Sequence, residues 1–256
     1  VVLIFGSAAL MLIGLSAVGG WSGLHAKLPA DFFSMWKPVN HPDFPWTGVV
    51  FGAPILGVWY WCTDQHIVQR VLAAKTEGDA RRGTVFAGYL KILPVFIFVL
   101  PGMIAAALYT DVKGQADAAY PALVTRLLPA GFKGLVLAGM LAALMSSLAS
   151  AFNSCSTLLT WDVYRKMNPN ASEKRLVQVG RMSTVILVGL GLAWIPFMKY
   201  ISPQLYIYLQ SVQAYIAPPI AACFLLGVLM PRLNGTGAMS ALLVGFVLGA
   251  LRLGLE

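Results

Sequence analysis

The sequence predicts an all-α polytopic membrane protein with about seven transmembrane helices. Hydrophobic residues make up 58% of its 256 residues and charged residues only 11%, whereas a soluble domain has about 45–50% and about 25%. Seven stretches of 17 or more residues contain no Asp, Glu, Lys or Arg, and about 20 apolar residues cross a bilayer as a helix. This composition excludes a soluble enzyme, a disordered tail and a secreted disulfide scaffold.

The predicted spans belong to one continuous membrane domain, 1–256, because no linker or low-complexity tract divides the sequence. They cover about 1–19, 46–62, 84–109, 134–160, 181–198, 204–230 and 237–255. Val1 is not a start methionine, and Glu256 directly follows an apolar stretch. We therefore expect the sequence to be an internal segment of a longer membrane protein.

The basic residues indicate how the spans are oriented. The net charge is +8, but it is spread over the connections between spans and does not form a nucleic-acid-binding stripe. The second, fourth and sixth connections hold ten Lys and Arg residues, and the first, third and fifth hold six. Because basic residues favour the cytoplasmic side, the even-numbered connections are predicted to be cytoplasmic.

The first span ends at Gly19-Gly20, and an outer loop rich in Pro and aromatic residues follows. The second span, about 46–62, contains Gly48, Gly52, Pro54 and Gly57. Glycine and proline at membrane depth are typical of the interrupted helices that line transporter binding sites. The alternative is a kinked, closely packed helix.

Tyr60 and Trp61 end the second span. Their rings suit either the membrane interface or a stack on the apolar face of a ligand. After them, Asp64 is expected to be a helix-end carboxylate and His66 a solvated histidine.

Lys91 lies in the third span between apolar residues, in the segment GYLKILPVF. A lysine at the centre of a membrane helix costs roughly 2.5–3.5 kcal/mol, so it needs a partner or a function. One interpretation is that its ammonium donates hydrogen bonds to a hydroxyl-rich or anionic ligand. The other is that the side chain extends to the cytoplasmic interface, where Arg82 lies.

A short amphipathic helix is predicted in the outer loop at 122–129, before the fourth span. The fourth span has polar residues at steps of three and four, which place them on one helical face: Ser146, Ser150, Asn153, Thr157 and Thr160. Such a face is typical of helix–helix contacts. Alternatively, Ala143, Ser146 and Ser147 gather one carbonyl and two hydroxyls, the oxygen ligands that a small hard cation prefers.

Ser172 is expected to cap the helix of the fifth span. The sixth span contains Ala217-Pro218-Pro219, downstream of Gln210 and Gln213, and is the second predicted interrupted span. No catalytic triad, His/Glu metal motif or nucleotide-binding loop is present in the sequence. These features predict a secondary transporter driven by an ion gradient, with no enzymatic activity and no cofactor.

Four segments resemble the sodium:solute symporter family, and three of them its sodium/glucose cotransporter branch. The segment GVLMPRLNGTGAMSALLVGFV, 227–247, resembles a signature of the whole family. The segments similar to the sodium/glucose branch are WYWCTDQHIVQR at 59–70, MSSLASAFNSCSTLLTWDVY at 145–164 and YLQSVQAYIAPPIAA at 208–222. They occur in the family's order and are spread over nearly the whole chain.

The resemblance implies the leucine-transporter-type inverted-repeat fold. The seven spans would correspond to core helices 5 to 11 of that fold. Core helices 1 to 4 would then lie outside this sequence, and both interrupted spans would lie beside the central binding site.

The resemblance also implies roles for individual residues. Tyr60 is similar to the aromatic inner gate that packs on the sugar ring, and Trp61 to a neighbouring sugar-site tryptophan. Lys91 and Gln210 match residues that hydrogen-bond sugar hydroxyls. The sodium ligands matched by this sequence are Ala143, Ser146 and Ser147.

The resemblance thus implies sodium-coupled symport of a glucose- or galactose-like sugar in the plasma (inner) membrane, with sodium as the co-transported ion. Three residues depart from the family pattern. Ala149 replaces the threonine of members that use a second sodium, which favours one sodium per cycle. Gly57 and Gln213 replace residues near the sugar, so a symporter for a polyol, an amino acid or a carboxylate is an alternative. Another is a transporter-like sensor module.

Overall fold

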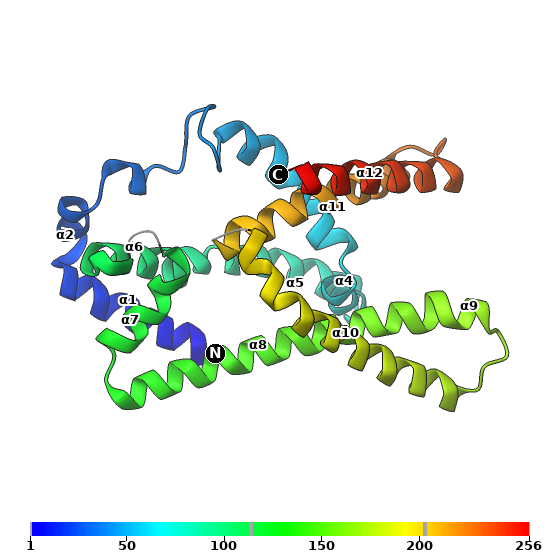
Figure 1. The fold of residues 1–256 in the computed structure, drawn as a ribbon, viewed down its shortest axis with the longest axis horizontal. Coiled ribbons are helices and arrows are strands. Elements are labelled where there is room, and N and C mark those ends of the chain that lie inside the picture. The colour runs from blue at the N-terminus through cyan, green and yellow to red at the C-terminus, as the bar shows by residue number, and fades with distance from the viewer. Residues whose placement is uncertain (1, 113–114, 202–203, 256) are drawn as a thin grey trace. The chain divides into compact units, whose positions relative to one another are not determined.

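The computed structural model describes residues 2–112, 115–201 and 204–255, and these residues form helices and turns without a strand (Figure 1). A bent pair of helices, Val2–Val18 and Gly20–Lys27, passes as one span, and Gly48–Thr63 is a shorter apolar helix. Five helices in the described ranges are long and apolar enough to cross a membrane: Glu77–Leu108, Ala130–Met167, Glu173–Met198, Leu205–Leu229 and Gly235–Arg252. These helices confirm the all-α polytopic class with five candidate spans, or six if the bent pair is one span; the seventh predicted span, about 46–62, corresponds to the shorter apolar helix and stays a prediction.

The contacts divide the chain into two compact units, each made of two separate segments. The first unit comprises Val1–Phe33 and Arg81–Tyr200, and the second comprises Ser34–Ala80 and Ile201–Glu256. The interpretation of 1–256 as one membrane domain stays a prediction.

The core of the first unit forms around α1 (Val2–Val18). This helix packs against α6 (Leu100–Leu108), α7 (Ala119–Leu127) and α8 (Ala130–Leu158). Each of the four helices contributes a fully buried side chain, and these are Leu10, Ile104, Leu123 and Val136. The remaining length of α8 is largely exposed, as expected for a helix that lies in lipid or against other helices.

Two glycines allow α1 and α8 to approach closely. A Cβ atom at Gly6 would lie 2.7 Å from Cγ2 of Val136, and one at Gly139 would lie 3.2 Å from the backbone nitrogen of Leu3. Without a hydrophobic driving force between helices in lipid, small residues permit the van der Waals contact that holds helices together.

The first span ends where the sequence predicts. Gly19 and Gly20 have φ angles of +96° and +75°, which residues with a Cβ atom rarely adopt. The chain bends by 70° there, and α2 (Gly20–Lys27) and the 3₁₀ turn η1 (Ala30–Phe33) follow.

The third span contains an irregular turn that the sequence pattern did not predict. The helix α5 (Glu77–Leu90) ends in a turn at Lys91 and Ile92, and a π-helical segment, η4 (Val95–Val99), leads into α6. Pro94 has no backbone N–H, so it cannot bond to the carbonyl of Leu90 four residues earlier. The apolar helix Glu77–Leu108 nevertheless passes through this irregular turn as one candidate span, in agreement with the prediction over about 84–109.

The predicted surface helix at 122–129 is confirmed as α7, which follows the 3₁₀ turns η5 (Thr110–Val112) and η6 (Ala116–Ala118). Leu123 and Val124 are buried, and the residues on the opposite side are exposed. Hydroxyl oxygens of Ser7 and Tyr120 lie 2.5 Å apart and link α7 to α1.

An ion pair links α7 to η5. Arg126 donates two hydrogen bonds to the carboxylate of Asp111, of 2.9 Å and 2.6 Å. Its guanidinium also lies 4.9 Å from the centre of the Tyr109 ring. The hydrogen bond from Arg126 lowers the pKa of Asp111, and the same bond raises the pKa of Arg126.

The helix α8 continues through the π-helical η7 (Leu159–Tyr164) into α9 (Arg165–Met167). A short loop leads to α10 (Glu173–Ile201). The predicted cap is confirmed, because the Ser172 hydroxyl accepts a hydrogen bond of 3.4 Å from the backbone N–H of Arg175.

In the second unit, the predicted second span alternates between π- and α-helical turns. The segments are η2 (Gly48–Gly52), α3 (Ala53–Val58) and η3 (Trp59–Thr63), after which α4 (Gln65–Leu72) begins. The irregularity predicted from its glycines and proline is thus present as π-helical turns.

The second unit also contains α11 (Leu205–Leu229) and α12 (Gly235–Leu255). The helix α11 runs without a break through Pro218 and Pro219. The prediction that the sixth span is interrupted is therefore wrong, because the helix tolerates both prolines with missing backbone donors and without an unwound segment. In particular, Pro219 cannot bond to the carbonyl of Tyr215 four residues earlier.

Candidate functional site

The aromatic residues predicted to contact a substrate lie in η3. The Tyr60 ring is half-buried, and its centre lies 5.5 Å from that of Trp61, with the two planes at 88°. Such edge-to-face contacts fix ring orientation in addition to burying area. Trp61 is 39% exposed, which leaves part of its ring available to a ligand.

The end of η3 is held by local hydrogen bonds. The Thr63 hydroxyl donates to the carbonyl of Trp59 at 2.6 Å. Asp64 has an extended backbone and caps α4 by accepting a hydrogen bond from the N–H of His66 at 3.3 Å. These bonds satisfy backbone groups that the π-helical turn and the new helix leave without partners.

Gln210 lies on α11, which packs against both α3 and η3. Its side chain is half-buried, as is that of Gln213 one turn later. The second unit thus brings together the elements that hold Tyr60, Trp61 and Gln210. An amide beside aromatic rings can supply directed hydrogen bonds while the rings cover an apolar face.

Lys91, the fourth predicted substrate contact, belongs to the first unit and lies at the break between α5 and η4. Its backbone N–H is shared between the carbonyls of Ala87 and Gly88, at 3.2 Å and 3.1 Å. Its side chain is exposed. A role beside Tyr60, Trp61 and Gln210 stays a prediction.

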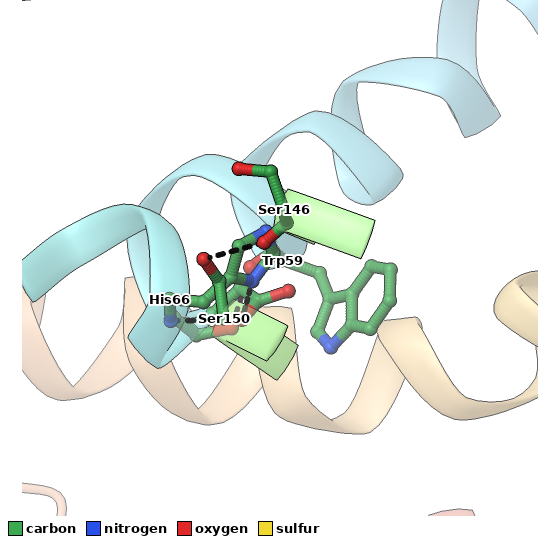
Figure 2. A network of polar contacts seen from close by, with 6 residues as sticks. Trp59, His66, Ser146 and Ser150 are labelled. Atoms are coloured by element: carbon green, nitrogen blue, oxygen red, sulfur yellow. Dashed lines mark hydrogen bonds and ion pairs between the residues drawn. The ribbon is translucent and has the colours of Figure 1, made fainter. Parts of the chain in front are cut away.

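The three predicted sodium ligands lie on α8, where Ala143, Ser146 and Ser147 are all exposed. The carbonyl of Ser146 accepts a hydrogen bond of 3.0 Å from the Ser150 hydroxyl (Figure 2). The predicted ligands are the carbonyl of Ala143 and the hydroxyls of Ser146 and Ser147. They lie on adjacent turns and present partial negative charge without a carboxylate. This arrangement suits reversible binding of a small cation.

Comparison with known proteins identifies the family. Residues 1–245 match the model of the sodium:solute symporter family. The chain belongs to the sodium:solute symporter family. This confirms the resemblance inferred from the four sequence segments and, with the apolar helices, establishes a multi-pass integral membrane protein.

Several relatives within the sodium:solute symporter family are similar over most or all of the chain. The chain is 41% identical to the pig sodium/myo-inositol cotransporter 2 and 43% identical to the mouse sodium/glucose cotransporter 4, over its whole length in both cases. It is 45% identical to the bovine sodium/mannose cotransporter over 89% of its length. The chain spans 43%, 42% and 41% of these relatives, respectively, and thus less than half of each.

Sequence reasoning missed the contacts of His66. Its Nδ1 lies 2.7 Å from the Asp64 carboxylate, and the two side chains are only 21% and 27% exposed. The His66 ring also lies edge-on to Tyr60, with centres 6.1 Å apart, and Figure 2 shows His66 within a network of polar contacts. The expectation of a solvated histidine is therefore wrong, and the signal was the carboxylate two residues before it.

The polar face of α8 divides into two parts. Near its end, the Ser156 hydroxyl donates to the carbonyl of Gly180 on α10 at 2.7 Å, and Thr160 donates back to Ser156 at 2.8 Å. The interpretation of the polar residues as helix–helix contacts therefore holds for this part of the helix. Ser146 and Ser147, two to three turns earlier, are exposed, so both interpretations of the polar residues remain compatible with the fold.

Proposed function

We propose that the protein is a sodium-coupled symporter of a glucose- or galactose-like sugar, acting by alternating access in the plasma (inner) membrane. The observation that carries this proposal is the packing of α11 on η3, which places the elements of Gln210, Tyr60 and Trp61 together in one unit. Relatives named for glucose, mannose and myo-inositol support a ligand that is a ring with many hydroxyls.

In this proposal Tyr60 packs on the apolar face of the sugar ring, held in place by Trp61 and His66. Gln210 and Lys91 form hydrogen bonds with the hydroxyls. A site built to bond hydroxyls discriminates strongly against analogues that lack them. These contacts therefore set specificity as well as affinity.

Sodium is proposed to bind the carbonyl of Ala143 and the hydroxyls of Ser146 and Ser147. Binding there would stabilise an outward-open arrangement and raise the affinity for sugar. The seven spans are proposed to be core helices 5 to 11 of an inverted-repeat fold, in which one bundle rocks against the other around the fixed site.

A second candidate is symport of a cyclic polyol. The identity of 41% with the pig sodium/myo-inositol cotransporter 2 over the whole chain favours it. Gly57 and Gln213 both lie in the elements that form the proposed substrate site, so they are positioned to alter which ring fits.

The test is uptake of labelled glucose, galactose and myo-inositol by vesicles that contain the full-length protein, in sodium and in choline. Gln210→Ala is expected to abolish sodium-dependent sugar uptake, and Gln115→Ala, an exposed glutamine in the outer loop, is expected to preserve it. If sodium drives uptake of myo-inositol but not of glucose or galactose, the proposed substrate is the polyol and not the sugar. Absence of sodium dependence for every solute would refute symport.

A further inference from the structure

A shallow groove runs along the first half of α10. It is lined by Arg175, Gln178, Val179, Arg181, Met182 and Val185. The opposite side of α10 packs within the unit, since Gly180 accepts the hydrogen bond from Ser156 and Leu176 is only 7% exposed. The groove therefore lies on the side of the helix that points away from these contacts.

The groove has a cationic end and an apolar end. Its two arginines and Gln178 lie toward the start of α10, and Met182 and Val185 beyond them are 61% and 67% exposed. Side chains on a helix tilt toward its N-terminus, so both guanidinium groups extend toward the start of α10. Long basic side chains in this position place their charge at the interface while their stems cover apolar surface.

The surroundings of the cationic end are also basic. Between Asp162 and Arg181 the chain holds five Lys and Arg residues against two acidic residues. One base, Lys166, pairs with Asp162 at 3.8 Å. The Nε of Arg175 donates to the Tyr164 hydroxyl at 3.4 Å, which positions the guanidinium beside the groove.

The groove crosses the boundary between headgroups and hydrocarbon. The predicted span begins at Arg181, so at about 1.5 Å per residue the part from Arg181 to Val185 extends about 6 Å into the hydrocarbon core, and the part from Arg175 to Arg181 lies at headgroup level. The distribution of basic residues predicts that this end of α10 is cytoplasmic, and anionic lipids are concentrated in the cytoplasmic leaflet. Guanidinium groups match the geometry of phosphate oxygens.

We propose that this groove binds an anionic phospholipid. Arg175 and Arg181 hold the phosphate headgroup, and an acyl chain lies along Val179, Met182 and Val185. The inference is independent of which solute the protein transports.

The test is native mass spectrometry of the full-length protein with added dioleoyl phosphatidylglycerol or dioleoyl phosphatidylcholine. We expect the wild-type protein to bind the anionic lipid at least tenfold more tightly than the zwitterionic lipid. Replacing both arginines, as Arg175→Gln with Arg181→Gln, should weaken phosphatidylglycerol binding roughly 25-fold and leave phosphatidylcholine binding unchanged. If that variant does not fold, the single Arg181→Gln variant is expected to show a loss of roughly fivefold.

Lys174→Gln is the matched control, because it removes a positive charge from the same turn but Lys174 does not line the groove. It should change the affinity for phosphatidylglycerol less than twofold. Equal affinity of the wild type for both lipids, or an equal loss in Lys174→Gln, would overturn the proposal. Full displacement of the lipid by equimolar glycerol 3-phosphate would also overturn the proposal, because the groove would then be a site for a soluble anion.

Discussion

Serine residues on α8 differ in their environment although the sequence places them in one polar span. Ser156 is buried and bonded to α10, whereas Ser154 is buried at 5% exposure and its hydroxyl has no hydrogen-bond partner within the described residues. A hydrogen bond between membrane helices contributes about 0.6 kcal/mol on average. A buried hydroxyl without a partner opposes folding instead.

We predict that replacing these two serines by alanine changes the free energy of unfolding in different directions. Ser156→Ala should reduce the free energy of unfolding by about 0.6 kcal/mol, with an upper limit of about 1.7 kcal/mol. Ser154→Ala should leave stability unchanged or raise it, because the change removes a polar group that bonds to nothing. Thermal unfolding of both variants in the same detergent measures the difference, and a larger loss in Ser154→Ala would contradict the structure.

Ser147 provides the test of the proposed cation site. Ser147→Ala removes one of three proposed oxygen ligands and should lower the apparent affinity for sodium about tenfold, as expected for a loss of about 1.4 kcal/mol. Saturating sodium should restore most sugar uptake. Ser183→Ala on α10 serves as the control, and sodium titration of uptake is the measurement. An unchanged sodium affinity in Ser147→Ala would remove this residue from the site.

At the scale of elements, the contact between α11 and α12 depends on two glycines of α12, because a Cβ atom at Gly245 would collide with Pro219 and one at Gly249 with Tyr215. Pro219 has no N–H to donate to the carbonyl of Tyr215. A Cβ atom at Gly249 would lie 2.7 Å from that carbonyl oxygen. The absence of a side chain at Gly249 therefore lets α12 approach the backbone of α11 at Tyr215.

Gly249→Ala should accordingly destabilise the protein by about 1–3 kcal/mol, because the added methyl group collides with backbone that cannot rotate away. Gly254→Ala is the matched control, since a Cβ atom there meets nothing within 4 Å. On helix propensity alone, the control should be neutral or stabilising by up to about 1 kcal/mol. Thermal unfolding of the two variants decides the matter, and equal melting temperatures would show that α11 and α12 do not pack in this way.

The stabilisation contributed by the ion pair between Asp111 and Arg126 is expected to depend on pH. Arg126 lowers the pKa of Asp111 in the folded protein, so the folded state favours the ionised carboxylate. The stabilisation is therefore complete above the unfolded pKa of about 3.9 and is lost as the pH falls through the lower folded value.

The measurement is the difference in melting temperature between the wild type and Asp111→Asn as a function of pH. The wild type should melt higher at pH 7, and the difference should shrink below about pH 4. High salt should reduce the difference at pH 7, because both side chains are exposed and exposed charges are screened. A difference that stays constant down to pH 2 would show that the ion pair does not stabilise the loop.

At the scale of the whole molecule, hydropathy alone predicted the five long apolar helices and the bent pair of the structure, because exclusion of water from the bilayer determines where apolar stretches lie. The break at Lys91 was missed although Pro94 was visible in the sequence, because a proline does not reveal whether a helix bends or ends. The His66–Asp64 pair was missed because burial of a residue near a membrane surface depends on neighbouring helices. For the candidate site, the residue types were predictable, but the packing of α11 on η3 required the structure.

Coupling between sodium and sugar tests the proposed function of the whole protein. If sodium bound through Ser146 and Ser147 raises the affinity for sugar by some factor, sugar must raise the affinity for sodium by the same factor. We expect a factor between about 5 and 150, the usual range for coupled sites. Quenching of tryptophan fluorescence, to which Trp61 would contribute, can follow both titrations on the full-length protein in detergent. Equal factors would support one conformational equilibrium shared by both ligands, whereas sugar affinity that is independent of sodium would refute coupled binding.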